Sequence, residues 1–211
     1  MTLPELSRRE RKKEETRRRI FEAAIALFRE KGYEATTVDE ITEKADVGRG
    51  TFFNYFPKKE SVLAYLSEER LAAAEENAGA LLAEARPARE KILDLYLLAA
   101  GAWEEDRELS QFVFSEWLRR VFAPTADVEL GWRKLMFALL GQGRESGELR
   151  DDVSDYRADA LFTSIYMTTL FHWLFCPAEC MPRDFDLRAE LRTRLEIVFD
   201  GLAPRKPGAR P

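Results

Sequence analysis

The sequence predicts an all-α fold of about nine helices, and three observations support that prediction. Apolar residues recur every three or four positions along most of the 211 residues, no segment alternates as a β-strand does, and no internal repeat is present. We expect a charged flexible arm over 1–15, a three-helix helix-turn-helix domain over 16–61, a larger helical domain over 62–203 and a disordered tail over 204–211.

Composition and charge limit the class of protein. Hydrophobic residues make up 45% and charged residues 34% of the chain, as in a globular domain, and no apolar run approaches the roughly 20 residues that a membrane helix needs. The N-terminus lacks the apolar segment of a signal peptide, so we expect a cytoplasmic protein with no membrane partner. Residues 1–61 hold 14 Lys/Arg against 12 Asp/Glu, whereas the chain as a whole has a net charge of −5. The basic end is therefore the one expected to face phosphates.

The first helix is expected over 16–31, with Gly32 as its C-terminal stop. Its apolar stripe consists of Ile20, Ala24, Leu27 and Phe28. Before and into this helix, the stretch 8–19 contains eight basic and three acidic residues. The charged arm is either a solvated tail or a segment that lies along DNA phosphates and adds affinity without sequence selectivity.

The segment 37–56 predicts two short helices joined by a turn. Thr37 and Glu40 have the spacing of a capping box, in which each side chain accepts a hydrogen bond from the other residue's backbone N–H. Asp46-Val47-Gly48 ends the first of these helices. Gly48 is expected to take the positive φ that a tight turn requires.

The second short helix begins near Arg49 and is expected to bury Phe52 and Phe56, which are four residues apart. Its outward side chains are then Arg49, Thr51, Asn54 and Tyr55. A guanidinium, a hydroxyl, an amide and a phenol are groups that bind base edges and phosphates in a major groove. The alternative is a solvated face on an ordinary helical hairpin.

Two stretches, G-Y-x-A-T-T-V-D-E-I and A-x-V-G-R-G-T-F-F-N-Y-F-P-K-K-E, resemble the N-terminal domain of the tetracycline-repressor (TetR) family of transcriptional regulators. The resemblance runs without gaps from about Thr16 to Val62, and beyond it only the length and the helical pattern agree. It implies that the second short helix enters the major groove of double-stranded DNA. The DNA-contacting residues that it implies are Thr16, Arg17, Thr37, Gly48, Arg49, Gly50, Thr51, Phe53, Asn54, Tyr55 and Lys59.

These residues have different expected roles. Arg49 is expected to bind either a guanine or a phosphate, and Lys59 and the Thr37 hydroxyl to hold phosphates. Thr16 and Arg17 stand at the start of the expected first helix, where the positive end of the helix dipole favours a phosphate. Gly50 permits a close backbone approach. Phe53 departs from the family pattern, since many relatives have Tyr there, so a phosphate-binding hydroxyl is missing and its contact should be van der Waals.

The remainder of the chain predicts six further helices. They are expected over 57–85, 88–106, 108–122, 127–146, 154–175 and 185–202. Pro57 suits the first turn of the long, Ala-rich first member, and Ser154 suits the N-cap of the fifth. The second member is apolar on nearly every side, so it should be central and buried.

The last two helices carry more apolar surface than one chain's core should need. In the family that the chain resembles, two such helices from each subunit form a four-helix interface, and a homodimer binds the two half-sites of a palindromic operator. The interface residues expected here are Leu161, Ile165, Thr168, Leu187, Leu191, Leu195 and Val198. The alternative is that these helices only complete the core of a monomer.

A small-molecule effector of unknown identity is a further expected partner, because aromatic residues are dense in the expected helices over 108–175. The candidate pocket residues are Trp103, Phe112, Trp117, Phe137, Tyr166, His172 and Trp173. An aromatic stripe is also what an ordinary core requires, and for each of these residues that alternative stays open.

His172, Cys176 and Cys180 are spaced four residues apart, as metal or redox ligands can be. Pro177 disturbs the helix at this point, and three ligands are fewer than the four of a structural zinc site. We therefore expect buried thiols at a helix end, no metal and no cofactor.

The combined prediction is a sequence-specific DNA-binding transcriptional regulator. We expect a repressor that a small-molecule effector releases from a palindromic operator by shifting a conformational equilibrium. The sequence contains no motif that places an activated Ser or Cys beside a His, or two carboxylates together, so we expect no enzyme. The alternatives are an activator or architectural DNA-binding protein without an effector, and a helical enzyme that shares only the N-terminal pattern.

Overall fold

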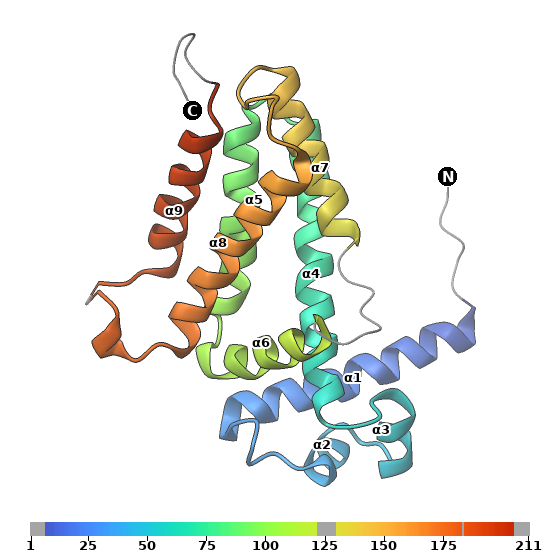
Figure 1. The fold of residues 1–211 in the computed structure, drawn as a ribbon. Helices are drawn as coiled ribbons and strands as arrows, with labels where there is room; N and C mark the ends of the chain where they lie inside the picture. Colours follow the sequence, from blue (N-terminus) through green and yellow to red (C-terminus); the bar gives the residue numbers. More distant parts are fainter. Residues whose placement is uncertain (1–6, 122–129, 183, 205–211) are drawn as a thin grey trace. The chain divides into compact units, whose positions relative to one another are not determined.

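The computed structural model of the chain describes residues 7–121, 130–182 and 184–204 (Figure 1). These residues form nine α-helices and one short 3₁₀-helix, and no strand occurs among them, which confirms the all-α prediction. The chain divides into two compact units, and helix α4 (Glu60–Ala83) contributes to both.

The first unit comprises Met1–Ser67 and Glu108–Arg120. Besides the start of α4, its helices are α1 (Arg8–Lys31), α2 (Val38–Lys44), α3 (Arg49–Tyr55) and most of α6 (Arg107–Val121). Helix α1 packs against α2, and α2 packs against α3. The bounds of α2 and α3 agree with the helix-turn-helix that the sequence predicts.

Helix α1 begins eight residues earlier than expected, because a second capping box starts it. The Ser7 hydroxyl accepts from the Glu10 N–H at 3.3 Å, and the Glu10 carboxylate accepts from the Ser7 N–H at 2.8 Å. Hydrogen bonding of the Glu10 carboxylate to Ser7 lowers the pKa of Glu10, through the Ser7 side chain most and through the Ser7 backbone next. The expectation of an arm over 1–15 is therefore wrong for the described part of that stretch, which is helical from Arg8 onward.

The turn between α2 and α3 differs in one respect from its prediction. The Thr37–Glu40 capping box is confirmed, with the Thr37 N–H donating to Glu40 Oε2 at 2.8 Å. The positive φ, however, belongs to Asp46 at 50°, while Gly48 has φ −73° and caps α3 in an extended conformation. Asp tolerates the left-handed region better than most side chains, so the turn closes without a left-handed glycine.

The core of the first unit holds α3 in place. Phe52 and Phe56 are 0% and 1% exposed, as the spacing predicted, and Ile20, Ile41 and Val62 are likewise buried. Because a seven-residue helix is unstable by itself in water, α3 depends on these buried contacts for its conformation.

The second unit comprises Glu68–Arg107 and Val121–Pro211. Besides the end of α4, it contains α5 (Ala88–Glu104), α7 (Leu130–Glu145), α8 (Asp155–Phe175), the 3₁₀-helix η1 (Ala178–Cys180) and α9 (Leu187–Leu202). Helices α5 and α8 each pack against both α7 and α9, and Ile92, Leu95 and Tyr96 of α5 are fully buried, as expected of a central helix.

The helix bounds in the second unit lie close to those expected. The expected start of α7 near Asp127 and the expected disordered tail lie outside the described residues, apart from Pro204 at the start of that tail. Within the described ranges, no helix combines the length and the apolar character that crossing a membrane requires.

Candidate nucleic-acid interface

Helix α3 keeps most of its expected DNA-contacting side chains at the surface. Arg49, Gly50 and Asn54 are exposed, Phe53 is 41% exposed, and Thr51 and Tyr55 are half-buried. A Cβ added at Gly50 would meet no atom within 4 Å, so the helix surface at this point is open to an approaching molecule.

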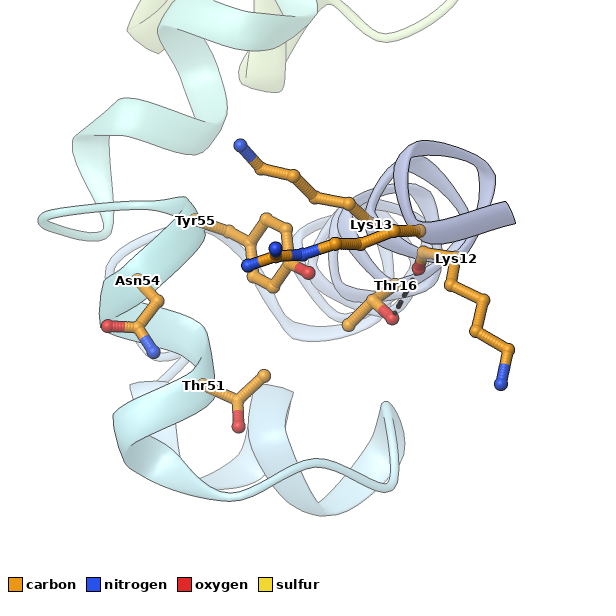
Figure 2. Close-up of a pocket in the computed structure, with 7 residues that line it drawn as sticks. Lys12, Lys13, Thr16, Thr51, Asn54 and Tyr55 are labelled. Atoms are coloured by element: carbon orange, nitrogen blue, oxygen red, sulfur yellow. Dashed lines mark hydrogen bonds between the residues drawn. The ribbon is translucent and has the colours of Figure 1, made fainter. Parts of the chain in front are cut away.

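A basic groove lies between α1 and α3 (Figure 2). It has a volume of about 420 Å³. Its lining residues are Arg9, Lys12, Lys13 and Thr16 from α1 and Thr51, Asn54 and Tyr55 from α3. Figure 2 shows the Tyr55 ring projecting from α3 toward α1. The groove therefore combines three cations and no carboxylate with hydroxyl, amide and phenol groups, which suits a phosphate backbone.

The α1 side of this groove depends on the unexpected length of the helix. Arg9, Lys12, Lys13 and Thr16 have the spacing i, i+3, i+4 and i+7, so a continuous helix places them on one face. The Thr16 hydroxyl donates to the Lys12 carbonyl at 2.9 Å, within that same helix. The three cations were not among the predicted site residues, although their spacing is visible in the sequence; the stretch that contains them was expected to be a flexible arm, either solvated or lying along DNA phosphates.

Thr16 and Arg17 do not stand at the start of α1, which corrects the reason given for their phosphate contacts. The helix begins two turns earlier, so the positive end of its dipole is near Ser7. Thr16 lines the groove, whereas the Arg17 guanidinium carbon lies 4.1 Å from the centre of the Tyr65 ring. Arg17 thus has a cation–π partner inside the first unit.

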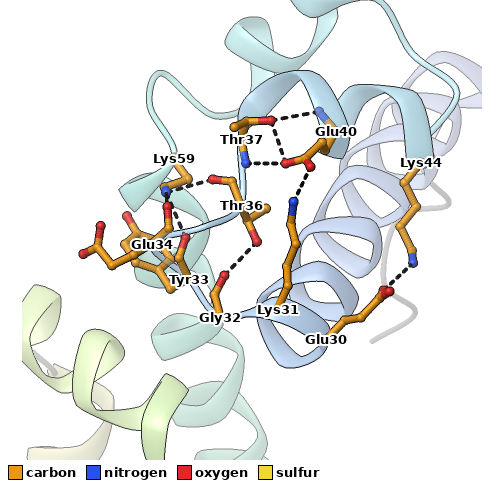
Figure 3. A network of polar contacts seen from close by, with 10 residues as sticks. All are labelled: Glu30, Lys31, Gly32, Tyr33, Glu34, Thr36, Thr37, Glu40, Lys44 and Lys59. Carbon is orange, nitrogen blue, oxygen red and sulfur yellow. Dashed lines mark hydrogen bonds and ion pairs between the residues drawn. The ribbon is translucent and has the colours of Figure 1, made fainter.

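Lys59 and Thr37 take part in hydrogen bonds within the first unit (Figure 3). The Lys59 ammonium donates to the carbonyls of Tyr33 and Thr36, both at 2.9 Å, and lies 4.3 Å from the centre of the Tyr33 ring. The Thr37 hydroxyl donates to Glu40 at 2.7 Å. The structural role of Lys59 was not indicated by the sequence pattern, whereas that of Thr37 is the predicted capping box; the phosphate contacts of both residues stay predictions.

Glu40 connects this network to α1. Its carboxylate accepts a hydrogen bond from Lys31, which is the largest cause that lowers its pKa to about 2, followed by the bonds from Thr37. A carboxylate that is bonded in its charged form stabilises the folded state at neutral pH. The Lys31–Glu40 ion pair links the C-terminal end of α1 to the first turn of α2, and so helps to hold the helix-turn-helix in position on α1.

Comparison with known proteins agrees with this arrangement. Residues 20–66 match the family described as "Bacterial regulatory proteins, tetR family". The crystal structure of Thermus thermophilus FadR, a TetR family transcriptional repressor in complex with lauroyl-CoA, superimposes with a TM-score of 0.69 at 32% identity, covering 92% of this chain and 99% of that chain.

The chain belongs to the TetR family. It is a helix-turn-helix transcriptional regulator that binds DNA. Curated relatives include the fatty acid metabolism regulator protein of Bacillus subtilis, 23% identical over 186 residues that cover 87% of this chain and 93% of the relative. The regulator TcmR of Streptomyces glaucescens is 29% identical over 234 residues, covering 95% and 91% respectively. Both alignments thus extend over nearly the full length of these two regulators.

The candidate pocket residues of this TetR-family regulator are distributed over both units. In the second unit, the Trp103 indole N–H donates to the Tyr166 hydroxyl at 2.9 Å, which brings two of the seven together. Phe137, His172 and Trp173 are half-buried in the same unit. Phe112 and Trp117 belong to the first unit, where they contact Tyr33 and Phe114 with ring centres 4.7 and 5.7 Å apart. The two α6 aromatics thus have neighbours inside the helix-turn-helix unit.

Three of the expected dimer-interface residues are buried inside one chain, which corrects that part of the prediction. Leu187, Leu191 and Leu195 are at most 1% exposed, because α9 turns this stripe toward its neighbours in the second unit. The helical spacing was recognised correctly, but a stripe that repeats every four residues is equally what a monomer core requires.

A different apolar stripe remains exposed on the two last helices. Leu161, Phe171 and Phe175 of α8 are 49%, 47% and 37% exposed, and Thr168 between them is also at the surface. On α9, Ile197 is 67% exposed. The members on α8 share one side of that helix, since they follow each other at intervals of seven, three and four residues. Of the predicted interface residues, Leu161 and Thr168 belong to this stripe, whereas Ile165 and Val198 are half-buried.

The thiols at the end of α8 are not both buried, contrary to expectation. Helix α8 ends at Phe175, Cys176 is its half-buried C-cap, and Cys180 lies exposed at the end of η1. The helix ends before Pro177, as expected because proline disturbs helical geometry. In the described part of the chain, no three His, Cys, Asp or Glu side chains are grouped as metal ligands would be.

Proposed function

We propose that this regulator is a homodimeric cytoplasmic repressor that leaves a palindromic operator when a long-chain acyl-CoA thioester binds to its second unit. The basic groove between α1 and α3 is the observation that supports this most directly. It combines three cations with Thr51, Asn54 and Tyr55 of the recognition helix. A phosphate strand in the groove would leave α3 facing the major groove, with the cations contributing affinity and α3 the sequence preference.

The homodimer is supported by the exposed stripe on α8 and α9. Several large apolar side chains on one side of α8 suit a helical interface more than a solvated surface. A two-fold dimer would present two copies of α3 to half-sites about 34–36 Å apart, or a multiple of that distance. One seven-residue helix offers too few base contacts for operator selection by itself.

The proposed effector is based on a similar protein whose ligand is known. The T. thermophilus repressor at 32% identity was crystallised with lauroyl-CoA. In the second unit of the present chain, the guanidiniums of Arg70 and Arg107 lie over the indoles of Trp103 and Trp173, each 5.4 Å from the ring centre. Cations beside apolar aromatic surface suit a ligand that joins an acyl chain to phosphates.

The test is a binding measurement with the full chain. An operator is selected from random DNA, and its affinity is measured by fluorescence anisotropy with and without lauroyl-CoA, with free CoA and laurate as controls. We expect a selected palindrome, and operator affinity that falls at least roughly tenfold with lauroyl-CoA alone, as for an effector that prefers the other conformer. Unchanged affinity would refute the effector, and an absence of any selected sequence would refute operator binding.

A further inference from the structure

The side chain that begins the recognition helix has a partner on the preceding helix. Arg49 is the first residue of α3, and its Nη1 lies 2.6 Å from Oδ1 of Asp39 in the first turn of α2. The guanidinium carbon also lies 5.8 Å from the centre of the Phe53 ring, one turn further along α3. Among the described residues, Arg49 is thus held from two sides, by a carboxylate and by an aromatic face.

We propose that Asp39 is a positioning residue that fixes the direction in which Arg49 meets a base edge. This inference rests on the proposed operator binding and identifies a determinant of its sequence preference. The carboxylate occupies one terminal nitrogen of the guanidinium, which leaves the edge formed by Nε and Nη2 directed away from Asp39. That edge supplies the two parallel donors that match O6 and N7 of guanine.

The exposure of the pair indicates that it does not serve chiefly to stabilise the fold. The side chains of Arg49 and Asp39 are 63% and 68% exposed, and ion pairs at such positions contribute little to folding. The pair instead restricts the conformation of the Arg49 side chain. A free arginine side chain has many rotamers, so a guanidinium that is already tethered loses less conformational entropy when it binds a base.

The charge of Asp39 should lower the affinity for DNA of any sequence, although it raises the preference for one base. A carboxylate on the DNA-facing side of α2 neutralises Arg49 and repels phosphates, so it lowers the affinity for any DNA. The same carboxylate raises the preference for one base by orienting Arg49. Removing the charge should therefore increase affinity for random DNA while reducing discrimination at one position of each half-site. A purely structural role for Asp39 would not produce changes in opposite directions.

The experiment compares single-base preferences of the full chain and five variants. Each protein is titrated against the selected operator, all its single-base substitutions and random DNA. We expect the wild type to prefer guanine at one position per half-site by roughly 5- to 150-fold, the range for a bidentate arginine contact. In Asp39→Asn, this preference should fall to within about threefold while random-DNA affinity rises, because the guanidinium is released.

Four further variants make the outcome specific. Glu43→Gln removes a carboxylate from an exposed position of the same helix, one turn beyond Asp39, and should leave the guanine preference intact. Arg49→Ala should abolish the preference at the same position, and adding Asp39→Asn to it should change nothing more there. Asp39→Glu, which keeps the charge, should retain most of the preference and confirms that the fold tolerates substitution at this site.

The outcomes separate the two proposals. If the wild type selects an operator and Asp39→Asn keeps its full base preference, the positioning role is wrong and operator binding stands. If the Asp39→Asn and Glu43→Gln variants lose preference equally, the effect is one of charge and not of position, which also overturns it. If the wild type selects no sequence, operator binding fails, and the role of Asp39 fails with it.

Discussion

Removing the two lysines of the basic groove should weaken the salt dependence of DNA binding by a calculable amount. In the variant Lys12→Ala/Lys13→Ala, each subunit loses two cations that line the groove. Each cation that neutralises a phosphate contributes about 0.9 to the slope of log affinity against log salt, so a dimer that makes all four contacts should lose about 3.6 units of slope. Between about 50 and 200 mM salt, the wild-type affinity should then fall roughly 100-fold more than that of the variant.

The same helix provides a matched control. Arg11 and Arg18 are exposed and seven residues apart, about half a turn away from the groove side of α1. The variant Arg11→Ala/Arg18→Ala removes the same charge from the opposite side of the helix and should change the slope far less. Fluorescence anisotropy of the selected operator over a series of KCl concentrations measures both slopes. Equal slopes for the two double variants would refute the assignment of the groove to the phosphate backbone.

Three further predictions concern the scaffold and the proposed dimer interface. Glu40→Gln should destabilise the protein at pH 7, and the difference in unfolding free energy from wild type should shrink as the pH falls from 4.5 toward 2, because the folded-state pKa of Glu40 is about 2 against an ordinary value of 4.5. Urea unfolding at several pH values measures this difference. A difference that does not depend on pH would contradict the role of the Glu40 charge. Leu191→Ala should cost about 2–5 kcal/mol of unfolding free energy because the side chain is fully buried. Ile197→Asp should leave the fold intact and produce monomers in sedimentation experiments, since this side chain is 67% exposed in one chain; a stable Ile197→Asp dimer would exclude the proposed stripe.

The sequence predicted the helix-turn-helix well because the determinants of that motif are local. A capping pair such as Thr37 and Glu40 lies three residues apart, and two aromatic anchors such as Phe52 and Phe56 lie four apart, so each signal is complete within one turn. The same local signal was present at Ser7 and Glu10, but the first two turns of the helix that follows are highly charged and contain no apolar residue. Periodicity identifies a helix only where one side of it is buried.

The sequence by itself determined the all-α class, the resemblance to the family and the position of the helix-turn-helix, since these follow from short-range spacing and capping. Only the tertiary structure decided which apolar stripe is core, which lysines form one groove, and which carboxylate faces Arg49. Leu191 and Ile197 illustrate the reason: both are aliphatic residues of α9, yet one is 0% and the other 67% exposed. Burial and ion pairing depend on neighbours that are distant along the chain, and tertiary packing determines which residues those neighbours are.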